Sequence, residues 1–229
     1  MDHAYDAPAT PVAGASLVCV LALHDRGRLP YASLHGEPMH VHAWRALVTA
    51  SERLAVAPPV LLVDPHDRVA ALADLALATG RAPDEVVVGD PARWRPPVAA
   101  DVLVHDPLCP LTPADFLVEL GATAPRVAAV GCRPVTDTVK TVEDDRIDAT
   151  VDRDGLVAVA APALVPAARH RGGALPTADM PTLLRWLRED GDVALPKAPS
   201  MARRVEDGSA LVVLESIDEL AGRVRTAPR

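Results

Sequence analysis

The sequence has 229 residues, of which 49% are hydrophobic and 24% are charged. This length and composition are ordinary for one globular domain that buries a core, and they exclude the disordered, collagen-like and coiled-coil classes. Aromatic residues make up 3% and the formal net charge is −8, so a broad nucleic-acid-binding surface is not expected. A local basic pocket for a small anion remains compatible with this composition.

The three cysteines, Cys19, Cys109 and Cys132, are far apart and form no CxxC pair. They indicate neither a disulfide framework nor a zinc site, and a reducing, cytoplasmic location fits them best. Residues 1–14, rich in proline and alanine, are predicted to be a disordered leader, and residues 15–229 a single domain. No apolar run approaches the roughly 18 residues of a membrane span, so we expect no membrane partner.

Short apolar runs recur along the chain, each of the kind that forms a strand buried on both faces. They lie at residues 16–23, 60–63, 85–88, 101–104, 126–130, 156–160 and 210–214. Between them, N-cap residues and first-turn prolines predict helices from about 64 to 79 and from about 112 to 120.

A capping box at Ser216 and Glu219 predicts a last helix, ending at about Arg225. Strands that alternate with helices predict an α/β fold with a mostly parallel, doubly wound sheet. Ligands of such sheets bind outside the carboxyl ends of the strands. The loops that follow the strands are therefore the places to look for chemistry.

One such loop is HDPLCPL, residues 105–111. A carboxylate at this strand edge, Asp106, is well placed to hold Mg²⁺ or a ribose hydroxyl. His-Asp-Pro is also a common turn signal, and on the residues alone a turn or cap role for Asp106 is the more frequent outcome. Cys109 would be a reactive thiol only with a paired base, which the sequence does not supply.

The segment CRPVTDTVKTVEDDRIDATVDRDGLVAV, residues 132–159, predicts a hairpin arm at about residues 135–155 that projects from the main sheet. Two extended, β-branched stretches flank its acidic turn. The hydroxyl group of Thr138 and the cationic groups of Lys140 and Arg153 on these stretches are suited to binding a phosphate. The alternative is a solvated hairpin whose charges prevent its edges from pairing wrongly.

Taken together, VTDTVK, the following TVDRDGL, the preceding HDPLCPLTP and the Arg-Gly-Arg loop after the first strand resemble the 2-C-methyl-D-erythritol 4-phosphate cytidylyltransferase family. The motifs occur in the family's order and spacing from about Ser16 to Arg225. The resemblance implies a Rossmann-like nucleotidyltransferase fold with a protruding β-arm and a homodimer formed through that arm. It also implies Mg²⁺ and transfer of CMP from CTP to 2-C-methyl-D-erythritol 4-phosphate in non-mevalonate isoprenoid biosynthesis.

Position by position, the resemblance implies a nucleotide-binding loop at Gly27 and Arg28 and a metal ligand at Asp106, which also lies near the nucleotide. It implies that the arm residues bind the sugar phosphate across the dimer: Thr138, Lys140 and Arg153. The catalytic residues predicted in this way are Arg28, Asp106 and Arg153.

The chain departs from the family pattern where phosphate charge is stabilised. The family's first loop has two glycines and a Pro-Lys pair, but here His24 or Asp25 replaces the first glycine and Tyr31 replaces the lysine. Loss of one such donor typically lowers turnover by about 10²–10³. Cys109 replaces an arginine, and the family's last Asn-Ile-Lys, whose lysine holds the substrate phosphate, falls on residues 211–213.

Two functions of different class therefore remain open. The first is an impaired cytidylyltransferase, or a transferase for another nucleotide and sugar phosphate. The second is a catalytically inactive homologue that acts as a ligand-binding or protein-interaction dimer. Lys197, Arg203 and Arg204 either replace the missing cations from another direction or belong to a charged surface loop.

Overall fold

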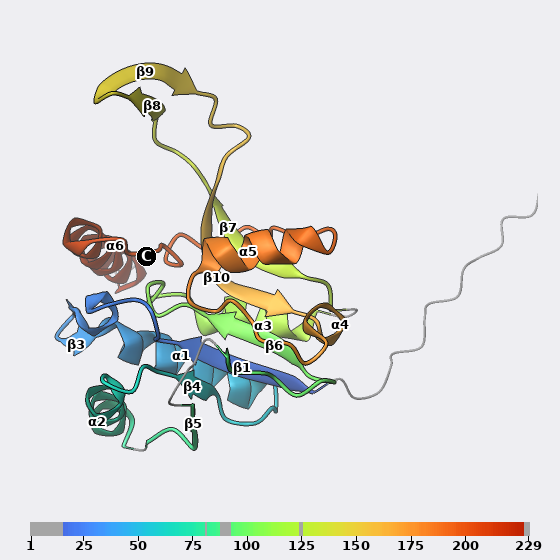
Figure 1. Ribbon diagram of the computed structural model, residues 1–229. Helices are drawn as coiled ribbons and strands as arrows, with labels where there is room; N and C mark the ends of the chain where they lie inside the picture. Colours follow the sequence, from blue (N-terminus) through green and yellow to red (C-terminus); the bar gives the residue numbers. More distant parts are fainter. Residues whose placement is uncertain (1–15, 81, 88–92, 124–125, 227–229) are drawn as a thin grey trace, which may run out of the picture.

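The computed structural model describes residues 16–80, 82–87, 93–123 and 126–226, so the predicted leader lies outside the described residues. Its centre is a six-stranded sheet with the order β5-β4-β1-β6-β10-β7 (Figure 1). The strands are β1 (Leu17–Ala22), β4 (Val60–Leu62), β5 (Glu85–Val87), β6 (Asp101–His105), β7 (Ala129–Pro134) and β10 (Val157–Val165). Strands β5, β4, β1 and β6 are parallel, and β10 runs antiparallel to β6 and β7. The predicted α/β class with a mostly parallel sheet is confirmed.

Helices cover both faces of this sheet, as the doubly wound prediction requires (Figure 1). They are α1 (Met39–Arg53), α2 (Arg68–Thr79), α3 (Ala114–Ala122), α4 (Ala167–His170), α5 (Met180–Glu189) and α6 (Gly208–Thr226). A short 3-10 helix, η1 (Leu29–Tyr31), and the two-residue strands β2 (Ser33–Leu34) and β3 (Glu37–Pro38) connect β1 to α1. Within the described residues, no helix combines the length and apolarity needed to cross a bilayer.

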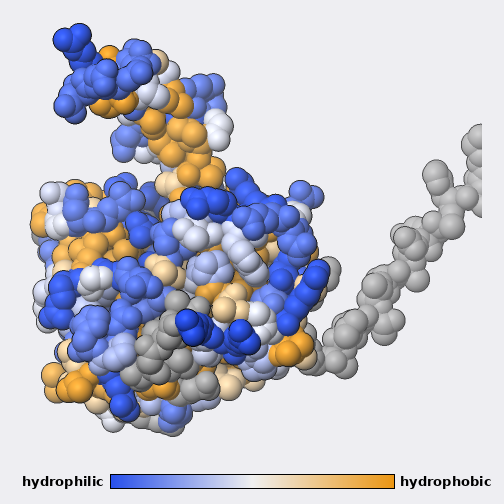
Figure 2. Space-filling view, in the orientation of Figure 1, coloured by the Kyte–Doolittle hydropathy of each residue, from blue (hydrophilic) through white to orange (hydrophobic). Residues whose placement is uncertain are grey.

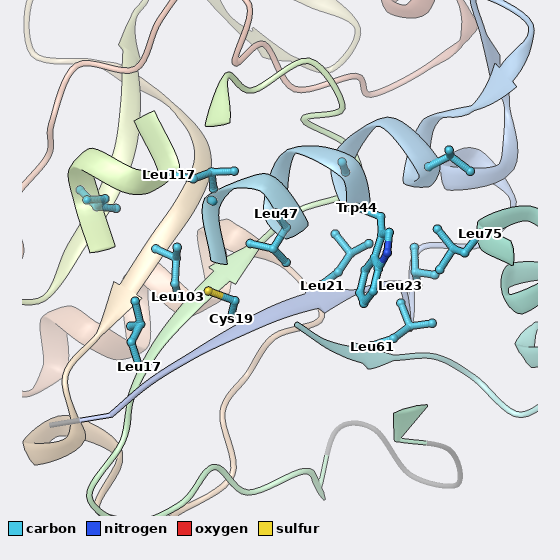
Figure 3. Close-up of a cluster of buried hydrophobic side chains, with 14 of the residues drawn as sticks. Leu17, Cys19, Leu21, Leu23, Trp44, Leu47, Leu61, Leu75, Leu103 and Leu117 are labelled. Carbon is cyan, nitrogen blue, oxygen red and sulfur yellow. The ribbon is translucent and has the colours of Figure 1, made fainter. Parts of the chain in front are cut away.

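Strand β1 shows why its sequence is apolar almost throughout. Leu17, Cys19 and Leu21 point to one face, where they pack with α1, α2 and α3 (Figure 3). Val20 and Ala22 point to the other face and pack with α5. Each buried aliphatic side chain of this kind contributes about 1.5–3 kcal/mol. The two apolar layers hold the strand ends, and the loops that follow them, in fixed positions.

The predicted arm is present as a two-stranded hairpin of β8 (Val139–Glu143) and β9 (Arg146–Val151). It stands clear of the body of the molecule (Figure 1). Asp144 and Asp145 form its turn with φ of 46° and 58°, the left-handed conformation that tight hairpin turns require. In Figure 2 the arm has a hydrophobic stem and a mainly hydrophilic tip.

The prediction of a strand at 210–214 is wrong, because these residues lie inside α6. The Asp207 carboxylate accepts a hydrogen bond from the backbone N–H of Ala210, at 2.8 Å, and so caps the start of this helix. Leu211 and Leu214 are buried while Val212 and Val213 between them are exposed, which is the period of a helix rather than of a buried strand. The predicted capping box at Ser216 and Glu219 is also wrong, since both residues are within α6.

The strand predicted at 126–130 is shifted towards the carboxyl end, where β7 begins at Ala129 and continues to Pro134. Arg126 precedes the strand, and its guanidinium donates to the Gly121 carbonyl and to the Asp101 carboxylate. Strand β7 then leads directly into the arm, so the loop expected after Val130 is the base of the arm.

Candidate active site

Asp106 follows β6 directly and is fully buried. Its Oδ1 accepts a hydrogen bond of 2.9 Å from the backbone N–H of Leu108, which is the turn role considered for this residue. Two guanidinium groups also surround the carboxylate: Arg26 Nε lies 3.2 Å from Oδ1 and Arg204 Nε lies 3.5 Å from Oδ2. We call Arg26, Asp106 and Arg204 the Asp106 group.

Arg26 is the buried member of this group, with a side chain that is 2% exposed. Its Nε donates to the Ala22 carbonyl and its Nη2 donates to the Thr177 carbonyl, at 3.0 and 3.1 Å. Three partners therefore hold the guanidinium in one orientation. Arg28 of the same loop is the residue predicted from the sequence, whereas Arg26 was not predicted, since its nearness to the end of β1 was its only local signal.

Arg204 is the more open member, with a side chain that is 21% exposed. It precedes α6 in a segment that is fixed by two backbone hydrogen bonds, from Ala202 N–H to the Pro199 carbonyl and from Val205 N–H to the Leu108 carbonyl. Residues 211–213, on which the family's phosphate-holding lysine falls, are inside α6. The cations that stand immediately before the last helix are Arg203 and Arg204.

The first loop, which follows β1, is hydrogen-bonded to other parts of the protein. His24 is buried, and its Nε2 shares a hydrogen bond of 2.8 Å with Thr177 Oγ1. The backbone N–H of Asp25 donates to Asp64 Oδ2 at 3.0 Å. A glycine-rich loop offers such amides to phosphate, whereas here at least one of them is already used by a carboxylate.

Gly27 and Arg28 lie at the outer edge of this loop. Gly27 has a φ of 58°, a conformation that glycine adopts without strain. The Arg28 side chain is 78% exposed, with Nη1 at 3.0 Å from Asp67 Oδ1 and its guanidinium 5.2 Å above the Tyr31 ring. The structure does not bring Arg28 into contact with Asp106. It leaves this guanidinium accessible to a solute.

Thr138, Lys140 and Arg153 all belong to the exposed arm. Lys140 Nζ donates to Thr150 Oγ1 at 2.6 Å, and Arg153 donates to the Thr136 carbonyl. The described residues of one chain do not bring these side chains to the Asp106 group. Their predicted role across a dimer stays a prediction.

A pocket of about 410 Å³ lies where the arm leaves the body. Arg133 from β7, Val159 from β10, and Arg203 and Arg204 from the segment before α6 line it. We call it the arm-foot pocket. Arg204 thus belongs both to the buried Asp106 group and to the lining of this open pocket. Lys197 is not among the residues that line the pocket, and its backbone forms a β-bridge with Cys132.

Cys109 and His105 are buried beside Asp106. Burial raises the pKa of the Cys109 thiol above its usual value, and the negative charge of Asp106 adds to this. The thiol is therefore unreactive. Burial lowers the pKa of His105 to about 4, and neither ring nitrogen has a hydrogen-bond partner. The neutral imidazole behaves as a core side chain.

The residues around Asp106 do not fit a divalent cation in this arrangement. Both carboxylate oxygens are occupied, by the Leu108 N–H and by the guanidinium groups of Arg26 and Arg204. A hard cation such as Mg²⁺ needs free carboxylate oxygens. Asp64, His66 and Asp67, between β4 and α2, do gather ligand atoms within 4.8 Å of one another, but Asp67 already pairs with Arg28.

Comparison with known proteins identifies the scaffold. The family model described as IspD, 2-C-methyl-D-erythritol 4-phosphate cytidylyltransferase, matches residues 29–171, more than half of the chain. The chain belongs to the IspD family. This membership agrees with the mostly parallel sheet.

A curated relative is the bifunctional enzyme IspD/IspF of Solidesulfovibrio magneticus, 31% identical over 147 residues. The match covers 58% of this chain and 36% of that relative, so the chain spans only about a third of the relative's length.

Solved structures agree on the fold. A crystal structure of 4-diphosphocytidyl-2C-methyl-D-erythritol synthase has a TM-score of 0.65 at 18% identity, covering 89% of this chain and 98% of that one. The 2-C-methyl-D-erythritol 4-phosphate cytidylyltransferase of Thermus thermophilus gives 0.58 at 20% identity, covering 88% and 98%. At these identities the likeness concerns the fold alone.

Proposed function

We propose that this chain transfers CMP from CTP to 2-C-methyl-D-erythritol 4-phosphate, and that Arg204 supplies positive charge that the altered first loop lacks. The observation that carries the proposal is the position of Arg204, which pairs with Asp106, Asp179 and Glu206 and also lines the arm-foot pocket. With 21 arginines and two lysines in the chain, arginine is the expected cation at such a position.

In the proposed reaction an oxygen of the acceptor phosphate attacks the α-phosphorus of CTP in line. The new P–O bond forms as the bond to the oxygen bridging to the β-phosphorus breaks, and pyrophosphate leaves with that electron pair. The protein contributes positioning and charge stabilisation. Arg204 faces the developing negative charge, while Asp106 and Arg26 are positioning residues that fix its guanidinium.

The nucleotide, bound as its Mg²⁺ complex, would lie over the first loop at Gly27 and Arg28, where the exposed Arg28 guanidinium meets its phosphates. The acceptor would be gripped by Thr138, Lys140 and Arg153 of a second copy's arm in a homodimer. Turnover would be lower than for a complete glycine-rich loop, because Asp64 occupies the Asp25 amide and Tyr31 stands in the lysine's place.

The second candidate is an inactive homologue that binds a ligand or a protein partner. One observation favours it: the first loop is bound to the protein itself through His24, Asp25 and Arg26, where a phosphate would need those groups. A retained fold does not by itself require a retained activity.

Pyrophosphate release by the purified chain tests the two candidates. With CTP, Mg²⁺ and 2-C-methyl-D-erythritol 4-phosphate we expect release that depends on both substrates. A parallel panel of ATP, GTP, UTP and CTP, followed by thermal unfolding, identifies the nucleotide by the largest rise in Tm. Absence of release together with absence of any nucleotide-dependent shift would leave only the inactive homologue.

A further inference from the structure

Arg133 and Arg203 both line the arm-foot pocket, which three carboxylate side chains also line: Asp137, Glu206 and Asp207. Both are about half-buried. Within the described part of the chain neither forms an ion pair, and the Nε of Arg203 is buried without a hydrogen-bond partner. Burial, followed by the positive charge of Arg203, holds the pKa of Arg133 below its usual value.

This arrangement costs free energy in the protein alone. A buried donor without a partner costs about 1–3 kcal/mol, and like charges in a partly desolvated pocket repel each other more strongly than in water. Proteins retain such arrangements most often at functional sites. An anion between the two guanidinium groups removes the repulsion between them.

The carboxylates near the pocket do not supply that anion. Glu206 lies 3.6 Å from Arg204 Nη1, and Asp207 Oδ1 accepts the Ala210 N–H that starts α6. Asp137 is exposed at the rim of the pocket.

The two arginines are held in place by the fold. Arg133 lies near the end of the pairing between β7 and β10, opposite Ala158. Arg203 lies next to Ala202, which is fully buried and packs with Phe116, Ala160 and Ala198. Neighbouring core contacts on both elements therefore fix the spacing of the pair before any ligand arrives, which lowers the entropic cost of binding.

We propose that Arg133 and Arg203 form an anion site that binds the dianionic phosphate group of a phosphomonoester directly, without a metal ion. Arginine forks match phosphate oxygens in pairs, and two of them match a double negative charge better than a single carboxylate. That the phosphomonoester is the acceptor substrate rests on the proposed function. The anion site itself rests only on the pocket.

Phosphate binding by the full chain tests this site without any nucleotide. Methyl phosphate is titrated by calorimetry in a buffer containing EDTA, with sodium acetate at equal ionic strength as the reference anion. We expect methyl phosphate to bind and to raise Tm, and acetate to have no effect beyond that of salt. Binding that appears only when Mg²⁺ replaces EDTA, or equal effects of the two anions, would overturn the proposal.

Two variants separate a binding role from a structural one. Arg203→Gln and Arg133→Gln should each weaken methyl phosphate binding by about tenfold or more, and each should raise Tm when no phosphate is present, because the repulsion is removed. Arg53→Gln, at an exposed ion pair with Asp115, is the matched control and should leave binding unchanged. A lower Tm in both variants with unchanged binding would show that the arginines are structural.

The proposed function and this site fail separately. Phosphate binding in EDTA without pyrophosphate release would refute the transferase activity alone. Pyrophosphate release from a chain that does not bind methyl phosphate in EDTA would refute the anion site alone.

Discussion

The Asp106 group and the arm-foot pocket use arginine in opposite ways, although they share Arg204. In the Asp106 group, two guanidinium groups enclose one buried carboxylate, and Arg26 is almost fully out of contact with solvent. In the pocket, Arg133 and Arg203 face solvent-accessible space with no ion pair among the described residues. The first arrangement is satisfied in the protein alone, whereas the second needs an outside anion.

This difference separates arginines that fix the geometry of the protein from arginines that are available to bind a ligand. A satisfied buried ion pair fixes geometry, but removing one partner leaves an uncompensated charge. An unsatisfied pair of cations stabilises nothing until a ligand binds. We therefore assign a positioning role to Arg26 and Asp106. Direct contact with phosphate is assigned to Arg204 and to the other arginines that line the arm-foot pocket.

The largest expected effect is on stability, from Asp106→Ala. Removal of the carboxylate leaves Arg26 buried beside Arg204 without compensation, and we expect the free energy of unfolding to fall by about 3–5 kcal/mol. Urea denaturation measures this. Asp115→Ala, which removes an exposed carboxylate on α3, is the control and should change stability by less than about 1 kcal/mol. Equal losses in the two variants would contradict the assigned positioning role.

The next largest expected effect is a dependence of stability on pH that comes from His105, the residue before Asp106. His105 has a folded pKa of about 4, below the usual 6.5, because it is buried. The unfolded chain therefore binds the extra proton, so stability rises with pH between about 4 and 6.5 and is lost as the pH falls, by about 3 kcal/mol in all. Burial lowers the pKa of His40 in the same direction.

His105→Leu isolates this contribution. Since neither ring nitrogen has a partner, an apolar side chain should be tolerated at pH 7, and the urea midpoint should fall less between pH 7 and pH 4.5 than in the wild type. His66→Leu, at an exposed ring, should keep the wild-type slope. An unchanged slope in His105→Leu would place the acid sensitivity elsewhere.

Substitutions at the tip of the arm, where contact with a second copy of the chain is predicted, should have the smallest effect on the stability of the folded body. Val142 and Ile147 are paired across the hairpin and are 65% and 70% exposed, and an isolated two-stranded hairpin is marginally stable in water. We expect Val142→Asp combined with Ile147→Asp to convert a dimer into monomers in analytical ultracentrifugation while the body unfolds at a similar temperature. Val69→Asp on α2, at a side chain 79% exposed, should stay dimeric. A wild type that sediments as a monomer would refute the arm-mediated dimer.

The sequence allowed much of the fold to be predicted, because β1, β4 and β6 are apolar on both faces and few other structures bury such runs. The run at 210–214 is also apolar but belongs to a helix. Its alternation of buried Leu211 and Leu214 with exposed Val212 and Val213 is too short to distinguish from a strand by pattern. Asp207 caps the start of this helix, and aspartate is a preferred N-cap residue, so this was a sequence signal that the prediction did not use.

The site was predictable only in part. Asp106 could be found from its place after a strand, because that place is fixed by the sheet order. The convergence of Arg26 and Arg204 on it could not, since the two are far apart in the sequence. They are positioned by hydrogen bonds from Arg26 to the Thr177 carbonyl and from the Val205 N–H, next to Arg204, to the Leu108 carbonyl. Sequence spacing carries no information about such contacts, and for that reason the positive charge at this site was underestimated.

The rate of pyrophosphate release by Arg204→Ala tests the account most directly. Measured with CTP, Mg²⁺ and 2-C-methyl-D-erythritol 4-phosphate, the rate should fall by about 10²–10³ relative to the wild type, while Arg53→Ala keeps the wild-type rate. A wild type that releases pyrophosphate and an Arg204→Ala variant that releases it equally fast would contradict the account, because phosphate charge would then be stabilised without Arg204.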